Sequence, residues 1–203
     1  MKLLNRITKF IFDQPVLYDK VRSLFLGGLP NAPVLKLLEA TSSDQILDVG
    51  CGTGFMANET TFQKYFGIDN DPRVIEIANR RNIKNAKFLL HDLSGSFPPL
   101  DFVPTKAILY GILHHLDDAA AAGLLRKLSG MVSDRIVTLD PVYSKRHFLN
   151  NILCKLDRGT YVRTESEMLR LVSSSGLEIK EKLLCYANTK IAKYIIFRLG
   201  RKT

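Results

Sequence analysis

The fold of this chain is decided by Ile46-Leu47-Asp48-Val49-Gly50-Cys51-Gly52-Thr53-Gly54. The stretch opens as a short apolar strand with one acid, and three glycines follow at alternate positions. Glycine lets a backbone turn tightly and lie close to a ligand. A second strand, Tyr65-Phe66-Gly67-Ile68-Asp69, ends in an acid that is placed to accept hydrogen bonds from ribose hydroxyls. The two stretches together predict a nucleoside pocket on a parallel α/β sheet.

Strands and helices alternate on both sides of this stretch. Hydrophobic patterning predicts strands over 45–50, 64–69, 86–91, 107–113 and 136–140, with Pro141 ending the fifth. Helices are expected after Thr53, from Asp71-Pro72, and from a cap at Asp117 and Asp118. Two last strands, 177–186 and 190–199, read as an antiparallel hairpin. Such alternation implies right-handed crossovers and a doubly wound sheet, whose ligands bind at the carboxyl ends of the strands.

The flanks of the alternating core read as helical. Residues 1–40 are expected to form a helical cap, with a second short helix at 33–40. A short amphipathic helix is expected within 143–160, and another over Glu165–Ser175 with Thr164 as its cap. We therefore expect one domain over 1–203, divided into the cap (1–40), a ligand-binding half (41–140) and a substrate-side insertion with the closing hairpin (141–203).

Composition narrows the class of protein. The chain has 203 residues, of which 46% are apolar and 24% charged, as in soluble globular proteins. Its apolar runs fall short of the ~20 residues of a membrane helix, and Arg6 and Lys9 interrupt the first of them. The three cysteines are odd in number and lack a CxxC spacing, which argues against a disulfide framework or a zinc site. The expected location is the cytoplasm, and no metal is expected.

The positive charge is unevenly spread. The net charge is +9, made up of +3 over residues 1–40, −2 over 41–143 and +8 over 144–203. Basic flanks favour an anionic substrate, a membrane surface or nucleic acid, and a solvated basic surface is the open alternative. The basic flank carries Lys155, Arg158, Arg163 and Arg170, of which an arginine pair could clamp a carboxylate or phosphate, and a salt-bridged surface loop explains them equally well.

The glycine spacing separates two families. Dinucleotide-binding enzymes carry GxGxxG, which the alternate Gly50, Gly52 and Gly54 do not match. With Asp48 before them, these glycines resemble the first motif of the class I S-adenosylmethionine-dependent methyltransferases. The resemblance continues in chain order through Gly67-Ile68-Asp69, His91-Asp92-Leu93 and Tyr110-Gly111-Ile112-Leu113-His114-His115-Leu116.

The resemblance implies a fold, a cofactor and a set of residues that bind it. The fold is a mostly parallel seven-stranded sheet of order 3-2-1-4-5-7-6 with an antiparallel closing strand, and the cofactor is S-adenosylmethionine. Asp48 would hold the loop from below, Asp69 would bind the ribose, and Asp92 would accept the adenine amino group. The cofactor-binding residues expected on this basis are Asp48, Gly50, Cys51, Gly52, Gly54, Asp69, Asn70, Asp92, Leu93 and Tyr110.

The expected activity is methyl transfer to a small molecule, at an oxygen. His114 and His115 are the candidate bases because a neutral imidazole takes a hydroxyl proton near neutral pH. Structural roles for both histidines stay open, and Asp140 and Tyr143 are weaker candidates. The acceptor is expected to be anionic or lipid-linked, with peripheral membrane contact as a further alternative.

Three other functions remain as alternatives. An RNA methyltransferase would use the basic flanks, and a non-catalytic binding module would keep only the fold. A nicotinamide oxidoreductase is disfavoured by the glycine spacing. The Asn/Asp-Pro-Pro-aromatic turn of many nucleic-acid amine methyltransferases is missing, because Gly111-Ile112-Leu113-His114 stands in its place.

Overall fold

The computed structural model describes residues 29–93, 96–144, 147–156, 159–187 and 189–202. The part of the expected helical cap that precedes Leu29 lies outside these residues. Its second helix is observed as α3 (Asn31–Leu38), close to the predicted 33–40. No helix within the described ranges combines the length and the apolar character that crossing a bilayer demands.

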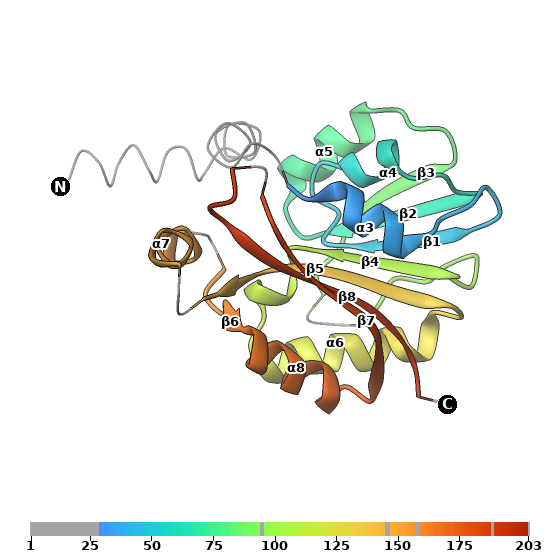
Figure 1. Cartoon of the computed structure of the whole chain (residues 1–203). Coiled ribbons are helices and arrows are strands. Elements are labelled where there is room, and N and C mark those ends of the chain that lie inside the picture. The colour runs from blue at the N-terminus through green and yellow to red at the C-terminus, as the bar shows by residue number, and fades with distance from the viewer. Residues whose placement is uncertain (1–28, 94–95, 145–146, 157–158, 188, 203) are drawn as a thin grey trace.

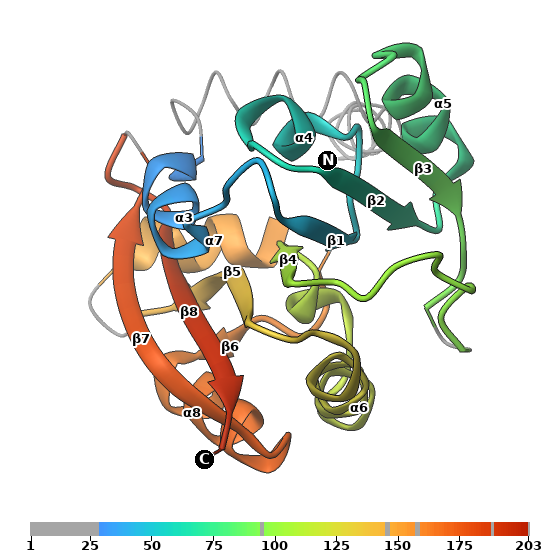
Figure 2. The same ribbon diagram turned by 90° about the vertical axis from the view of Figure 1, so that its right-hand side faces the viewer.

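One twisted sheet runs through the molecule in the order β3-β2-β1-β4-β5-β8-β7 (Figures 1 and 2). Its first five strands are parallel, and β8 is antiparallel to both of its neighbours. This order is the one predicted for the seven long strands. The sequence did not predict β6, a two-residue strand that pairs with the end of β5. The strands are β1 (Gln45–Val49), β2 (Lys64–Asp69), β3 (Ala86–Leu90), β4 (Lys106–Tyr110), β5 (Arg135–Tyr143), β6 (Arg163–Thr164), β7 (Leu177–Tyr186) and β8 (Lys193–Arg201).

Helices cover both faces of this sheet, as the alternating pattern predicts. In Figure 1, α3, α4 (Phe55–Glu59) and α5 (Pro72–Arg80) lie above the strands, and α6 (Asp118–Met131) and α8 (Glu165–Ser174) lie below. Each layer closes its own apolar cluster against one face of the strands. The remaining helix, α7 (Phe148–Leu156), lies beside the far end of β5. The two-sided burial explains why β1 and β4 are nearly continuous apolar runs.

The predicted helix caps at the starts of α5, α6 and α8 are confirmed. Asp71, Asp117 and Thr164 each accept a hydrogen bond from a backbone N–H in the first turn. Thr164 also exchanges bonds with Glu167 in a capping box. These caps satisfy donors that a helix start otherwise leaves unpaired.

The prediction that Pro141 ends the fifth strand is wrong. β5 continues through Pro141 to Tyr143 and pairs with β8 along the way. The backbone N–H and C=O groups of Leu139 point towards β4, since its carbonyl accepts from Gly111 N. Two residues later, the backbone nitrogen of Pro141 points to the same side. Because β4 has already ended at Tyr110, the N–H that proline lacks has no ladder partner to lose.

The predicted fourth strand is also shorter than expected. β4 ends at Tyr110, where Gly111 takes a φ of +72 that continues poorly as a strand. A single 3₁₀ turn, η1 (Leu113–His115), follows and carries both candidate histidines. The sheet therefore presents them on a tight turn at its carboxyl edge rather than on the strand itself.

A buried lysine, Lys106, lies at the other end of β4, where the strand begins. Lys106 Nζ donates to the Glu39 carbonyl at 2.6 Å and lies 3.1 Å from Asp44 Oδ2. Asp44 also accepts hydrogen bonds from Thr105 and Thr41. Burial would raise the pKa of Asp44, but the bonds from Thr105, Thr41 and Lys106 outweigh it and lower the pKa to about 2.

We predict that Asp44→Asn destabilises the fold in a pH-dependent way. The carboxyl titrates near ~4 in the unfolded chain, so its stabilisation is complete above that pH and is lost as the pH falls through about 2. The expected loss at pH 7 is about 2 kcal/mol of unfolding free energy, and it shrinks towards zero at low pH. Urea denaturation over a pH series measures both values.

The matched control is Asp101→Asn. Asp101 pairs with Lys64 at the surface, where an ion pair contributes little to stability. This variant should unfold like the parent chain, and equal losses in the two variants would contradict the role given to Asp44.

Candidate cofactor and acceptor site

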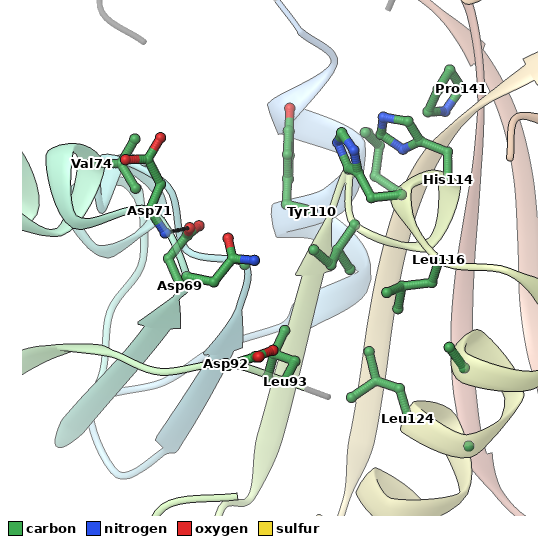
Figure 3. Close-up of a pocket in the computed structure, with 18 of the residues that line it drawn as sticks. Asp69, Asp71, Val74, Asp92, Leu93, Tyr110, His114, Leu116, Leu124 and Pro141 are labelled. Carbon is green, nitrogen blue, oxygen red and sulfur yellow. Dashed lines mark hydrogen bonds between the residues drawn. The ribbon is translucent and has the colours of Figure 1, made fainter. Parts of the chain in front are cut away.

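A cavity of about 580 Å³ opens at the carboxyl ends of β1, β2, β4 and β5. Figure 3 shows its two sides: Asp69, Asp71 and Val74 lie opposite His114, Leu116 and Leu124, with Tyr110 between them. The lining residues are Leu29, Gly50, Asp69, Asn70, Asp71, Val74, Asp92, Leu93, Tyr110, Gly111, Ile112, His114, His115, Leu116, Ala120, Gly123, Leu124, Lys127, Leu139, Pro141 and Tyr194. Six of the ten expected cofactor-binding residues and both histidines are among them.

The glycine loop reaches this cavity through Gly50. The N–H groups of Gly50 and Cys51 both donate to the Ile68 carbonyl, so the loop folds over the end of β2. Gly50 has a φ of +75, and a Cβ on it would come within 2.9 Å of the Ile112 side chain. Only glycine therefore leaves the main chain bare at this point. Cys51, Gly52 and Gly54 do not line the cavity and form the rest of the turn.

The helix after this loop is short. α4 spans five residues and starts from Gly54 in a left-handed conformation. A helix of this length carries a small dipole, so the attraction of its N-terminus for a carboxylate is weak. The loop's contribution to the site rests instead on the close approach of its backbone.

Asp69 joins the two loops that flank the cofactor end. Its Oδ2 accepts from Gly52 N at 2.9 Å, and its Oδ1 accepts from Asp71 N at 3.0 Å. Each carboxylate oxygen keeps a second lone pair that can accept a hydroxyl. Burial raises the pKa of Asp69, although these backbone bonds oppose the rise. Asp69 thus ends β2 on the wall of the cavity, where its carboxylate can accept hydrogen bonds from ribose hydroxyls.

Asp48 lies beneath the site rather than in it. Its Oδ2 accepts the Tyr65 hydroxyl, and its Oδ1 has no hydrogen-bond partner among the described residues. Burial raises the pKa of Asp48 to about 7. The structure separates this acid from the cavity, so its contact with the rest of the site runs through strand β1.

The other side of the cofactor end combines polar and apolar residues. Asn70, Asp92 and Leu93 line the cavity, as expected, and Leu116 and Leu124 add apolar surface from η1 and α6. The Tyr110 hydroxyl donates to Asn31 Oδ1 at 2.6 Å, and its ring meets Phe55 edge-on. Asn31 stands 79 residues from Tyr110, and no local pattern in the sequence indicates this contact.

His114 forms a buried pair with Asp140. Its Nδ1 lies 2.8 Å from Asp140 Oδ1, which also accepts from His114 N at 3.1 Å. Burial raises the pKa of Asp140, while contact with His114 and the charge of Arg163 limit the rise. The second oxygen of Asp140 has no partner in the described part of the chain. Of the two candidate histidines, His114 is therefore the one with an orienting carboxylate, and His115 is exposed beside it.

The segment that follows α7 packs directly on His114. A Cβ built on Gly159 would lie 1.9 Å from Cδ2 of the His114 ring, so no side chain fits there. Tyr161 N donates to the His114 carbonyl at 2.9 Å. Gly159 therefore packs against the edge of the imidazole that points away from Asp140, and Tyr161 holds the backbone of His114. The described residues of this segment therefore support the histidine.

Arg163 does not form the expected anion clamp. Its buried guanidinium donates to the carbonyls of Leu113, Leu116 and Tyr161 and pairs with Asp118. These bonds surround η1, so Arg163 holds the turn that carries His114. A guanidinium can do this because it presents five donors in a fixed plane.

The comparisons with known proteins agree with this geometry. Residues 46–134, which include the glycine loop, Asp69, Asp92 and His114, match the family described as "Methyltransferase domain". Residues 46–134 therefore form a methyltransferase domain. The residues present fit S-adenosylmethionine, the cofactor that the sequence resemblance implies, since Gly50 offers bare backbone and Asp69 a carboxylate at neighbouring strand ends. No curated protein matches the chain.

Solved structures share the fold at low sequence identity. An S-adenosylmethionine-dependent methyltransferase from Mesorhizobium loti has a TM-score of 0.67 and 18% identity over 87% of this chain and 100% of its own. The YcgJ protein from Bacillus subtilis gives 0.66 and 15%, covering 85% and 98%. The mitomycin 7-O-methyltransferase MmcR gives 0.63 and 20%, covering 90% of this chain and 58% of that one. At these identities the likeness concerns the fold.

We predict that two acids of this methyltransferase differ sharply in their effect on cofactor affinity. Asp69→Ala should weaken binding of S-adenosylhomocysteine by about 10- to 100-fold, because charge-assisted hydrogen bonds contribute roughly 1.5–3 kcal/mol. Asp48→Asn should leave the affinity within about threefold, since its side chain does not reach the cavity. Calorimetry with each purified variant gives the two constants, and a larger loss in the Asp48 variant would contradict the assignment.

We predict that Arg163→Lys lowers turnover more than cofactor affinity. An ammonium cannot serve three carbonyls and a carboxylate in one plane, so the η1 turn loses partners. The expected loss of stability is about 1–3 kcal/mol from buried carbonyls left unpaired. Methyl-transfer assays give the turnover, thermal unfolding the stability and S-adenosylhomocysteine calorimetry the affinity, with the exposed Arg170→Lys as the matched control. Equal behaviour of the two variants would show that Arg163 does not position the turn.

Proposed function

We propose that this methyltransferase transfers a methyl group to a hydroxyl oxygen of a small molecule, with His114 as the general base. The observation that carries the proposal is the buried His114–Asp140 pair on the wall of the cavity. An orienting carboxylate on one ring nitrogen is the arrangement that prepares the other nitrogen to accept a proton.

The chemistry of the pair follows from its hydrogen bonds. An ionised Asp140 accepts the proton on Nδ1, which places the lone pair of the neutral ring on Nε2. S-adenosylmethionine supplies an activated methyl group when it is bound. The protein's task is then to orient the acceptor and remove its proton, and orientation alone contributes on the order of 7–11 kcal/mol in favourable cases. A hydroxyl needs such a base more than an aniline does, because the aniline lone pair is unprotonated at neutral pH.

The shape of the cavity supports a small acceptor. Beyond Tyr110 the wall is formed by Leu29, Leu139, Pro141 and Tyr194, together with the two histidines. These residues make a largely apolar end that suits an aromatic or alicyclic ring carrying a hydroxyl. An anionic acceptor is less well supported than the sequence suggested, because the guanidinium N–H groups of Arg163 are hydrogen-bonded to backbone carbonyls.

The test compares three variants on one panel of acceptors. Methyl transfer is followed as S-adenosylhomocysteine release, with phenols and the matching anilines offered as acceptors. His114→Gln and Asp140→Asn should each lower kcat by roughly 10²–10⁴-fold while cofactor affinity stays within about threefold. The residual rate of His114→Gln should also lose the pH dependence that the parent owes to its imidazole base, because a glutamine amide does not titrate in this range.

The neighbouring histidine supplies the control. His115→Gln removes an exposed imidazole that lacks the Asp140 contact, and its kcat should fall by less than about threefold. Preferential methylation of the anilines, or full activity in His114→Gln, would overturn the proposal. Failure to bind S-adenosylhomocysteine at all would favour the non-catalytic alternative.

A further inference from the structure

Helix α7 presents its apolar side to solvent. Phe148 is 76% exposed, Leu149 61% and Ile152 38%, whereas Asn150 is 1% exposed. At 100° per residue, the three apolar side chains fall on one arc of the helix and Asn150 falls on the opposite arc. A surface helix normally turns its apolar stripe to the core, so this helix has the reverse orientation.

Two asparagine side chains fix that orientation. Asn150 Nδ2 donates to the Val142 carbonyl at 2.8 Å, and its Oδ1 accepts from Lys193 N at 2.7 Å. Asn151 exchanges two hydrogen bonds with the backbone of Ser144. These amides satisfy backbone groups at the ends of β5 and β8. The outward position of Phe148, Leu149 and Ile152 is therefore built into the fold.

The exposed arc carries one described positive charge. Lys155 is exposed, lies on the same side of α7 as Phe148 and Ile152, and has no ion pair among the described residues. In the sequence, the stretch 144–158 is basic, and the whole of 144–203 has a net charge of +8. An apolar arc within a basic sequence is the pattern of helices that lie in the interface of an anionic membrane.

We propose that the exposed arc of α7, formed by Phe148, Leu149, Ile152 and Lys155, docks on an anionic phospholipid bilayer. The positive charge of Lys155 and of the surrounding sequence favours this partner, because it complements phosphate headgroups. A second copy of the chain fits less well: stable interfaces bury about 800 Å² per partner. The arc offers three apolar side chains of a nine-residue helix. A bilayer needs no matching shape and accepts such a small insertion.

Docking at α7 would bring the cavity to the lipid surface. Asn150 bonds to Val142, whose neighbour Pro141 lines the cavity, and to Lys193, whose neighbour Tyr194 lines it too. Figure 1 shows α7 beside the ends of β5 and β8. The arrangement suits an acceptor that partitions into membranes. The inference itself does not depend on which atom is methylated.

The absence of tryptophan from the chain makes a direct test available. Phe148→Trp introduces a single tryptophan on the arc, and its selectively excited emission should shift to the blue when vesicles of phosphatidylcholine with phosphatidylglycerol are added. Vesicles of phosphatidylcholine alone should cause little shift, and added salt should weaken the response. Val103→Trp is the matched control. Val103 is 67% exposed and lies just before β4, at the end of the strands opposite to α7.

A second measurement uses the chain without a fluorophore. Phe148→Ser with Ile152→Ser should weaken co-sedimentation with the anionic vesicles by at least about tenfold, and Val103→Ser should change it by less than about twofold. Thermal unfolding verifies that both variants are folded. No vesicle-dependent shift, or equal shifts at positions 148 and 103, would overturn the proposal. A blue shift that grows with protein concentration in the absence of lipid would overturn it in favour of a second copy.

Discussion

The carboxylate of Asp69 is the contact on which the cofactor end of this protein depends. It accepts one backbone N–H from the loop after β1 and one from the loop after β2. Parallel pairing of these strands places both loops at one edge, and the single side chain then fixes their spacing. Gly50 can lie bare against the cavity because the loop around it is held in this way. The order of the strands, the glycine spacing and the acid therefore form one unit.

The acceptor end is built on a different principle. The η1 turn has few contacts within its own βα unit, and it is held from outside by Asp140, Tyr161 and Arg163. All three partners contact backbone atoms of η1, and Asp140 also contacts the His114 side chain, so much of this support does not depend on which side chains the turn carries. Variation of the side chains on this turn can then change the chemistry without loss of the fold, which is how one architecture serves many acceptors.

Sequence reasoning recovered what local pattern and spacing determine. The strands, the caps at Asp71, Asp117 and Thr164, and the positions of Asp69, Asp92 and Tyr110 all follow from periodicity and motif order. It missed contacts that join distant segments. Arg163 was expected at a substrate because its charge is visible in the sequence, whereas its carbonyl partners are not. The helix at 148–156 was found, but the asparagines that turn its apolar side outward act through β5 and β8. Pro141 was wrongly predicted to end its strand. The sequence around it does not show that β4 has already ended there, so that the missing N–H costs no hydrogen bond.

The close packing of Gly159 on His114 has a consequence for assembly of the enzyme during synthesis. The polar groups that form the nucleoside end lie between residues 50 and 110, whereas the imidazole is set in place only by residues 140 to 163. A growing chain would thus contain the polar groups of a donor pocket before it contains the residues that position the proposed proton acceptor. His114 is positioned last, after residues 140 to 163 have left the ribosome.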